Sequence, residues 1–401
     1  MAVVALGEAA IFNPQVKLAK GVIAPYVAME TLQPFTRDVY KTENKEYRGG
    51  TKFLDGDILM ARITPSLENG KTSIYRGGED SSKAAFGSTE FIVIRGVKGK
   101  ALTDFLYYLF TSTEIRDVAI ASMTGSSGRQ RVQNDVLKNY RVKLPTLKEQ
   151  QTIAATLGAL DDKIESNQSI SMKANFLADA EIEKILNTVD LRTGLLEEFV
   201  TFNANSVKPG DTEKLLYIDI ASVSPGRVDG VQELSWENAP SRARRKVADG
   251  DVIFSTVRPG RRSFALLLDP DPLAVASTGF AVITPRYPFG SSFLTYVAAS
   301  KSFSEYLQNS ASGSAYPAVS ITAMGKYEFA VPENEDLLAL IESQTMPLRR
   351  IAAQKISENR VLASLRDTLL PELISGRIRV PEARQAVEDA IDSELPEVRD
   401  V

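Results

Sequence analysis

Residues Pro145–Leu186 read PTLKEQQTIAATLGALDDKIESNQSISMKANFLADAEIEKIL, with one proline at the start and none inside. Thr146 and Glu149 have the spacing of a capping box, which marks the start of a helix. Apolar residues then recur at alternating steps of four and three, as in a coiled-coil seam, at Ile153, Leu157, Leu160 and Ile164. Asn167 takes the next seam position, and the apolar stripe resumes at Ile170, Ala174, Leu177, Ile182 and Leu186. At 1.5 Å per residue this helix is about 60 Å long, and alone it cannot bury its own apolar stripe.

A second stretch of the same character follows Pro332 and offers a partner helix within the same chain. Lys163–Asn167 (KIESN) lines up with Lys355–Asn359 (KISEN), an offset of 192 residues, and shorter matches keep their order upstream. The chain is therefore predicted to be a tandem duplication of a globular domain followed by a long helix. We predict that the two helices pair antiparallel through Ile153, Leu157, Leu160, Ile164, Asn167, Ile356, Asn359 and Leu362.

The duplication predicts an α+β fold in which two tandem α/β domains are separated by an antiparallel coiled coil of two long helices. Its predicted parts are a first domain (1–145), a central helix (146–190), a second domain (191–332), a C-terminal helix (333–380) and a tail (381–401). The tail is acidic and has few large apolar side chains, which predicts disorder. Inside the first domain, residues 103–118 are predicted to form one amphipathic helix.

The composition excludes several classes of site, because the chain contains no cysteine and no histidine. Disulfides, thiolate or HExxH zinc sites, and nucleophiles activated by histidine are all impossible. Chemistry based on lysine or carboxylates remains open, but we assign no catalytic residue, no metal and no cofactor. There is no apolar run of about 18 residues and no basic N-terminal segment, so we expect a cytoplasmic protein without a membrane span.

The net charge of −4 is unevenly distributed along the chain. Residues 1–145 carry 20 Lys and Arg against 15 Asp and Glu, and residues 201–332 carry 13 against 12. The helical stretches are acidic, with 5 against 10 in residues 146–200 and 9 against 14 in residues 333–401. This asymmetry is expected if the domains meet phosphate and the helices meet protein, although merely solvated helices would give the same pattern.

Thr124–Arg131 (TGSSGRQR) is a glycine-serine loop that ends in two arginines around a glutamine. Arginine can pair bidentately with guanine and glutamine with adenine, while serine and backbone amides contact phosphate. A simply solvated loop is the alternative. The predicted DNA-binding residues of the first domain are Arg62, Ser126, Ser127, Arg129, Gln130 and Arg131.

The second domain places seven basic residues within 21 positions, in Ser241–Lys246 (SRARRK) and Arg258–Arg262 (RPGRR). Ser312–Pro317 (SGSAYP) stands where the first domain has its arginine loop, as two domains that bind different DNA sequences would require. A solvated patch, or ion pairs to Asp249 and Asp251, is the alternative. The predicted DNA-binding residues here are Arg242, Arg244, Arg245, Lys246, Arg258, Arg261, Arg262, Ser314 and Tyr316.

Several motifs together carry a resemblance that covers nearly the whole chain. They are GSSGRQRV (125–132), LPTLKEQQTIA (144–154), LDDKI (160–164), APSRARR (239–245), GDVIFSTVRP (250–259) and LPELISG (370–376). The chain resembles the specificity subunit of type I restriction–modification enzymes. It departs from the pattern in one place, because residues 333–341 lack the Glu-Gln pair found at Glu149 and Gln150.

The resemblance implies a non-catalytic subunit with two target-recognition domains, each binding half of a bipartite sequence in double-stranded DNA. It also implies that the helices bind two methyltransferase subunits, and that restriction subunits join the complex. Two alternatives stay open. One is a stand-alone DNA-modifying enzyme, although the chain has no Asn/Asp-Pro-Pro-aromatic motif and no glycine-rich cofactor loop. The other is a coiled-coil scaffold for proteins, without a role on DNA.

Overall fold

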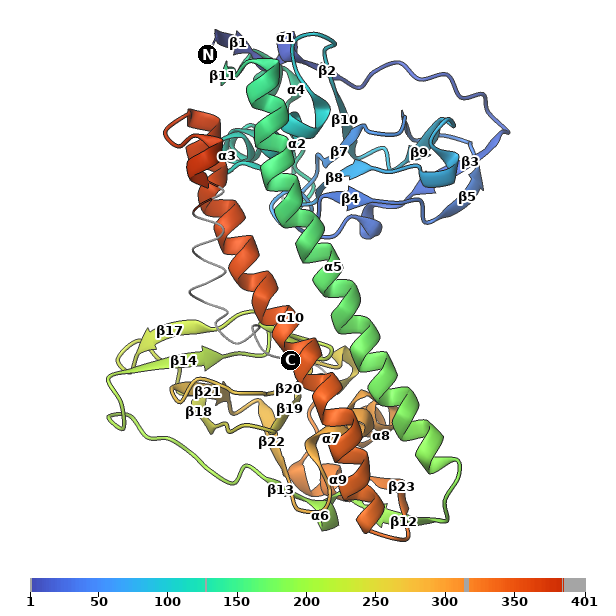
Figure 1. Cartoon of the computed structure of the whole chain (residues 1–401), viewed down its shortest axis with the longest axis vertical. Helices are drawn as coiled ribbons and strands as arrows, with labels where there is room; N and C mark the ends of the chain where they lie inside the picture. Colours follow the sequence, from blue (N-terminus) through green and yellow to red (C-terminus); the bar gives the residue numbers. More distant parts are fainter. Residues whose placement is uncertain (1, 127, 314–316, 384, 386–401) are drawn as a thin grey trace. The chain divides into compact units, whose positions relative to one another are not determined.

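The computed structural model describes residues 2–126, 128–313, 317–383 and 385, and it shows a mixed α/β protein (Figure 1). The chain folds as two compact units. The first unit joins the residues up to Asn167 to those from Glu358 onward, and the second unit runs from Gln168 to Ser357. The predicted boundaries set the long helices apart from the domains, whereas each compact unit includes half of each helix.

The first unit is built on two sheets that share a core. The main sheet has the order β2-β10-β7-β8-β4, and the second sheet has the order β5-β3-β9-β6. On β7, Ile58 and Met60 face the core on one side of the sheet and Leu59 faces the core on the other, so this strand is buried on both faces. The strands are β2 (Ala10–Phe12), β3 (Ile23–Val27), β4 (Asp38–Val39), β5 (Glu43–Glu46), β6 (Thr51–Phe53), β7 (Ile58–Ala61), β8 (Thr72–Tyr75), β9 (Ala85–Gly87) and β10 (Phe91–Gly96). A separate antiparallel pair joins β1 (Ala2–Ala5) to β11 (Arg141–Leu144).

Short helices cover one face of the main sheet, and the segment 103–118 is not the single helix that its pattern predicts. Ser112 ends one helix and caps the next, its hydroxyl accepting from the Ile115 N–H at 3.5 Å. A serine side chain that competes for backbone donors favours such a break. The helices are α1 (Leu6–Ala9), α2 (Thr103–Thr111), α3 (Thr113–Ala121) and α4 (Asn134–Asn139), with 3₁₀ turns η1 (Met29–Thr31) and η2 (Gly78–Asp80).

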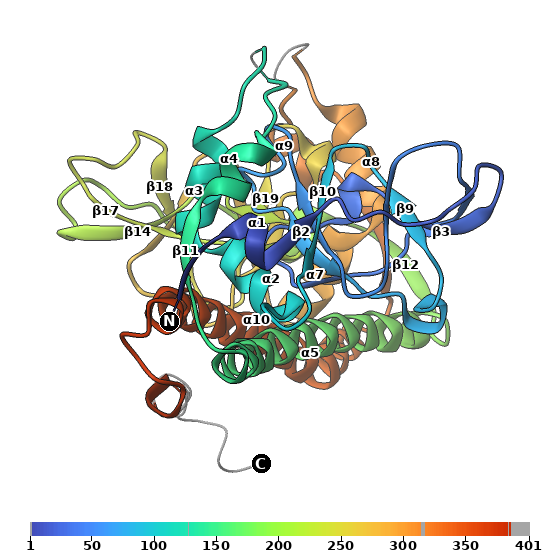
Figure 2. The same cartoon turned by 90° about the horizontal axis from the view of Figure 1, so that it is seen from above.

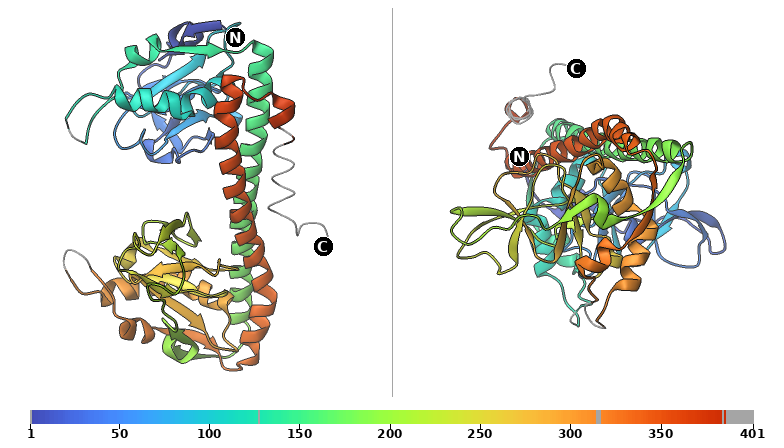
Figure 3. Two further views of the ribbon diagram at one scale, coloured as in Figure 1. Left: turned by 90° about the vertical axis from the view of Figure 1, so that its left-hand side faces the viewer. Right: turned by 90° about the horizontal axis from the view of Figure 1, so that it is seen from below.

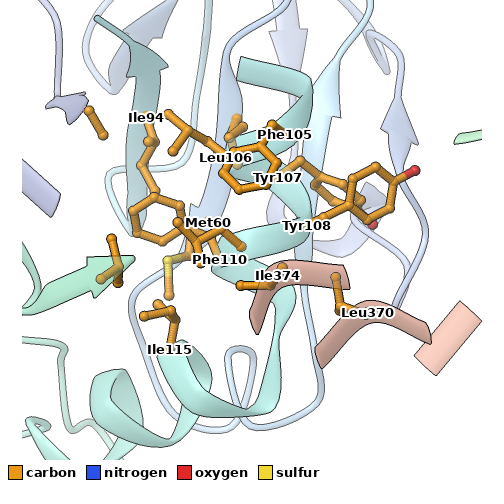
Figure 4. Packing of buried hydrophobic residues seen from close by; sticks show 14 of the residues in the cluster. Met60, Ile94, Phe105, Leu106, Tyr107, Tyr108, Phe110, Ile115, Leu370 and Ile374 are labelled. Atoms are coloured by element: carbon orange, nitrogen blue, oxygen red, sulfur yellow. The ribbon is translucent and has the colours of Figure 1, made fainter. Parts of the chain in front are cut away.

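The two long helices are α5 (Leu147–Leu186) and α10 (Asp336–Ser375). The predicted capping box of α5 is confirmed: the Thr146 N–H donates to Glu149 Oε2 at 2.8 Å, and the Glu149 N–H donates to Thr146 Oγ1 at 3.3 Å. In the first unit, the start of α5 and the end of α10 belong to the main core. Leu370 and Ile374 of α10 pack against α2 and α3 there (Figure 4).

Polar contacts join the two helix halves of the first unit. Asn167 Nδ2 donates to Asn359 Oδ1 at 2.9 Å, and Asn359 Nδ2 donates to the Ile164 carbonyl at 3.0 Å. Further along, Arg366 Nη1 lies 2.8 Å from Asp161 Oδ1. The later residue of α5, Asn167, meets the earlier residue of α10, Asn359, and the earlier residue Asp161 meets the later residue Arg366. The two helix halves therefore run in opposite directions within this unit.

The second unit repeats the plan of the first. Its main sheet has the order β13-β22-β19-β20, its second sheet the order β17-β14-β21-β18, and β12 pairs with β23 as β1 does with β11. The strands are β12 (Leu191–Leu195), β13 (Val200–Phe202), β14 (Lys214–Ile218), β15 (Val223–Ser224), β16 (Arg227–Val228), β17 (Gln232–Ser235), β18 (Ala243–Lys246), β19 (Val252–Ser255), β20 (Phe264–Leu266), β21 (Ala274–Ser277), β22 (Phe280–Pro285) and β23 (Glu328–Pro332). The short helices are α6 (Leu196–Phe199), α7 (Ser291–Ala299), α8 (Lys301–Ser310) and α9 (Ile321–Gly325), with a 3₁₀ turn η3 (Pro259–Arg261).

Identical backbone details support the duplication. Asn13 and Asn203 both have left-handed backbones, with φ of 51° and 52°. Each asparagine N–H donates to a strand carbonyl at 2.7 Å, that of Val93 or Val282, and its side-chain oxygen accepts from the same residue's N–H. Asparagine tolerates this conformation better than most residues, so the same residue is used at both places.

The helices are attached to the domains at equivalent positions by different residues. In the first unit, Gln150 Oε1 accepts from the N–H of Leu102, just before α2, at 2.9 Å. Glu342, 192 positions later, accepts from the N–H groups of Ser291 and Ser292 at 3.1 and 2.8 Å, at the start of α7. Residues 333–341 lack a Glu-Gln pair, but Glu342 occupies the structural place of Gln150. Burial raises the pKa of Glu342, while these N–H groups stabilise its charged form.

The predicted apolar stripe of α5 is right in its first half and only partly right in its second. Ile153, Leu157 and Leu160 are buried, and Asn167 is fully buried beside Asn359. In the second unit, however, Ile170 and Leu177 are 39% and 54% exposed. The predicted Ala174 and Ile182 are buried, and Ser171 and Ala178, which the stripe does not include, lie inward as well. A straight helix drifts against a strict 3.5-residue repeat, and that drift moves the buried face by one residue.

The predicted tail begins later than its composition indicates. Pro381, Glu382 and Ala383 are helical, and Ala383 is fully buried in the core of the first unit. Residues 386–401 lie outside the described residues. None of the helices that the structure describes is long and apolar enough to cross a membrane.

We predict that the buried ion pair of the first unit is essential to its stability. Asp161 accepts from Arg366 at 2.8 Å and from the Tyr108 hydroxyl at 2.6 Å, and burial keeps that hydroxyl protonated by raising its pKa. Arg366→Met should therefore leave a buried carboxylate without its cation and lower the free energy of unfolding by about 3–5 kcal/mol. Calorimetry would measure the loss. Asp367→Asn, which removes the exposed partner of the same arginine, is the control; an equal loss in both variants would contradict the prediction.

Candidate nucleic-acid interface

Two loops of the first unit meet at one end of the main sheet. The residues after β7 pair with the end of the loop between α3 and α4: Thr64 N–H donates to the Gln130 carbonyl at 3.1 Å, and Val132 N–H donates to the Arg62 carbonyl at 2.9 Å. The α3–α4 loop extends from the side of this unit opposite α5 (Figures 2 and 3). Predicted residues from two separate stretches are thereby brought together.

The centre of this region is an ion-paired cluster of Arg62, Glu90 and Arg131. Arg131 Nη2 donates to Glu90 Oε1 at 2.7 Å, and Arg131 Nε donates to both carboxylate oxygens at 3.0 and 3.1 Å. Arg62 Nε lies 3.8 Å from Glu90 Oε2, which is too far for a hydrogen bond. The Arg131 hydrogen bonds hold the pKa of Glu90 below its usual range and raise the pKa of Arg131, so both groups are charged at neutral pH.

Glu90 was not among the residues predicted from sequence. A signal was present, because the repeat aligns Ser88–Ile94 with Ser277–Ile283 and so sets Glu90 against Gly279. A charged residue opposite a glycine in a matched segment marks a position where the two domains differ. Its pairing with Arg131, 41 residues away, depends on the tertiary fold.

The other predicted residues of the first loop are accessible. Ser126 and Arg129 are exposed and Gln130 is partly exposed, while Ser127 lies outside the described residues. The Arg129 side chain makes no hydrogen bond or ion pair with any residue that the structure describes. It is therefore available to an external acceptor.

The second unit has the same backbone arrangement with different side chains. Arg258 N–H donates to the Pro317 carbonyl at 2.7 Å, and Val319 N–H donates to the Thr256 carbonyl at 2.9 Å. These bonds match those at Thr64 and Val132. The places of Arg62, Glu90 and Arg131 are thus taken by Thr256, Gly279 and Ala318. Two predicted residues of this loop, Ser314 and Tyr316, lie outside the described residues.

Three predicted arginines of the second unit lie in or next to the 3₁₀ turn η3, and they differ in their surroundings. Arg258 and Arg262 have left-handed backbones, with φ of 49° and 54°. Arg262 Nη2 donates to the carbonyl of Ala299 at the end of α7, so this side chain ties the turn to the helix. Arg261 is exposed.

The remaining predicted residues lie on β18 or next to it. Arg242 and Lys246 are exposed, whereas Arg245 is half-buried. Arg244 stacks on Trp236, with its guanidinium carbon 5.7 Å from the ring centre. Strand β18 lies close to the turn η3. The Arg242 carbonyl, just before β18, accepts from the Thr278 N–H at 2.8 Å, and the carbonyl of Gly279, the residue after Thr278, accepts from the Thr256 N–H, shortly before the turn. Both basic stretches therefore belong to one region of the unit.

A cleft of about 780 Å³ lies elsewhere in the first unit, between the turn before β7, the start of α2 and the start of α5. Its charges are largely neutralised internally, since Arg95 pairs with Asp57 at 2.6 Å and Arg76 pairs with Asp38 at 2.7 Å. Among the residues that the structure describes, no group of three or more acidic side chains is placed to hold a metal ion. The loops are the better candidate site.

Residues 3–174 match the model of the type I restriction modification DNA specificity domain. The chain is 28% identical over 180 residues to the type I restriction enzyme EcoEI specificity subunit of Escherichia coli, covering 43% of this chain and 30% of that protein. It is 22% identical over 403 residues to the HindI specificity subunit of Haemophilus influenzae, covering 80% of this chain and 86% of that protein.

The fold is also known from a solved structure. The S subunit of a type I restriction–modification system from M. genitalium matches with a TM-score of 0.55 at 15% identity, covering 93% of this chain and 95% of that one. The matched stretch spans less than a third of the length of the EcoEI subunit. Taken together, residues 3–174 match the family model of the type I restriction modification DNA specificity domain, and the chain is similar to specificity subunits of type I restriction enzymes.

Proposed function

We propose that this protein is a non-catalytic, sequence-specific DNA-binding subunit of a type I restriction–modification system. The observation that carries the proposal is the repeated loop frame. Both units hold two loops with matching backbone hydrogen bonds, but the side chains differ at the three central positions. Such a pair of domains suits a bipartite duplex target, with one half-site bound by each domain.

The chemistry of the exposed side chains supports duplex DNA as the ligand. Arg129 and Arg261 are exposed, and Arg242 and Lys246 add positive charge to the second unit. Arginine and lysine supply the phosphate contacts that dominate affinity for DNA. The excess of acidic over basic residues lies in the stretches that contain the long helices and the tail, residues 146–200 and 333–401. We place the protein in the cytoplasm, together with the DNA that it would bind.

We further propose that the helices bind two methyltransferase subunits and that restriction subunits complete the complex. In the second unit, α5 exposes Met172 and Phe176 by 68% and 71%, one helical turn apart. Large apolar side chains exposed side by side are typical of protein-binding surfaces. With no catalytic residue of its own assigned, the chain would direct methylation by its partners.

In the same proposal, α5 and α10 form an antiparallel coiled coil that separates the two DNA-binding domains. The opposite direction of the helix halves within each unit supports it, as do the Asn167–Asn359 pair in one unit and the Arg349–Asp179 pair in the other. The length of the helices, about 60 Å, would then set the unread gap between the half-sites.

We predict that Arg129→Ala weakens DNA binding by the complex with its methyltransferase partners. A lost phosphate contact should weaken all duplexes alike, whereas a lost base contact should reduce discrimination at one position by about 1–3 kcal/mol. Fluorescence anisotropy on duplex panels would separate the two results. Lys98→Ala, at an exposed turn outside the loop, is the control. Unchanged affinity with reduced folding stability would contradict a role of Arg129 in DNA binding.

Two neighbouring arginines of the second unit should behave differently. Arg262→Ala removes a charged hydrogen bond to the Ala299 carbonyl and should lower stability by about 1.5–3 kcal/mol. Arg261→Ala should leave stability unchanged but weaken DNA binding and lower its salt dependence. Thermal unfolding and salt titrations of DNA affinity would measure these effects. A loss of stability in Arg261→Ala together with weaker DNA binding in Arg262→Ala would contradict this assignment of roles.

The spacing role predicts the effect of lengthening α5. Four residues inserted after Ile164 would add about 6 Å, close to one helical turn. The half-sites should stay the same, while the gap between them lengthens by about one or two base pairs of about 3.4 Å each. Mapping methylated sites in DNA would reveal the gap. An unchanged gap with an altered half-site would show that the helices do not set the spacing.

A further inference from the structure

Glu90 holds the Arg131 guanidinium in one orientation at the base of the first domain's loop. The carboxylate accepts side-on from Nε and Nη2, and Nη1 donates to the Arg129 carbonyl at 3.3 Å. An arginine side chain has five N–H donors. Three are used here, so among the described residues one N–H on each terminal nitrogen remains without an acceptor.

A guanidinium with one free N–H on each terminal nitrogen can pair with the O6 and N7 acceptors of guanine in the major groove. The exposure of the pair agrees with such a role. The Arg131 side chain is 41% exposed and that of Glu90 is 24% exposed, so the carboxylate is the less accessible partner. Glu90 thus supports the arginine without blocking the edge that a base would meet.

The charge of the cluster also suits an approach to DNA. A lone carboxylate would repel phosphate, but Arg62 lies beside the same group, with Nε 3.8 Å from Glu90 Oε2. Two guanidinium groups around one carboxylate leave a net charge of +1. The second domain has Thr256, Gly279 and Ala318 on the matching backbone and cannot make this arrangement.

We propose that Arg131 binds a guanine in the half-site of the first domain through its two terminal nitrogens, and that Glu90 is the positioning residue that fixes its orientation. This inference rests on the proposed function and assigns one base contact within it. The second domain would have no equivalent contact, so the two half-sites would differ at this position.

The test uses the full chain in complex with its methyltransferase subunits and a library of random duplexes. Methylation rates would be compared for the wild type, Arg131→Lys, Glu90→Gln and the control Glu79→Gln, an exposed glutamate away from the loop. Lysine keeps the charge but lacks the two-pronged donor geometry. Arg131→Lys should lower the preference for guanine at one position by about 5- to 150-fold.

Glu90→Gln should lower the preference at that same position, in the same half-site, and add little to Arg131→Lys in the double variant. Glu79→Gln should change nothing. Equal weakening of all sequences by Arg131→Lys would overturn the inference, because that result indicates a phosphate contact. An altered preference at a cytosine in Glu90→Gln alone would also overturn it, since Glu90 would then bind the base itself. A wild-type complex that methylates without sequence preference would instead overturn the proposed function.

Discussion

Apolar residues of each long helix are buried in the cores of both units, and the remaining structure depends on this burial. In the first unit, Leu157 and Leu160 of α5 share one core with Phe105 of α2 and Leu370 of α10. In the second unit, Ile182 of α5 packs in the same core as Leu338 and Ile341 of α10. Truncating a large side chain in such a core lowers the free energy of unfolding by about 2–5 kcal/mol. Each helix half therefore contributes to the stability of the unit whose core it enters.

Buried polar groups add specificity that apolar packing alone lacks. An apolar stripe can slide by one turn with little change in buried area. The Asn167–Asn359 hydrogen bond and the Asp161–Arg366 ion pair each have only one register in which their partners meet. In the second unit the buried Arg349 has the same role with Asp179 and Asn175. Charges taken out of water need their partners, so these contacts penalise a shifted register.

The two duplicated domains share the same backbone arrangement at their loops but carry different side chains on it. The backbone hydrogen bonds that join the two loops are the same in both units, and so is the left-handed asparagine that follows the first strand of each main sheet. The side chains on that frame differ, from Arg62, Glu90 and Arg131 to Thr256, Gly279 and Ala318. A stable frame with exchangeable side chains lets one fold present two binding surfaces of different chemistry.

The sequence by itself determined the duplication, the start of α5, the first half of its buried stripe and the positions of the two loops. Each of these depends on residues close together in the chain or on a repeated pattern. Only the tertiary structure decided that Ala178, not Leu177, is buried. It also paired Arg131 with Glu90 and tied Arg262 to Ala299. Such partners lie tens of residues apart and meet only when strands and helices pack, so local pattern and propensity contain no information about them.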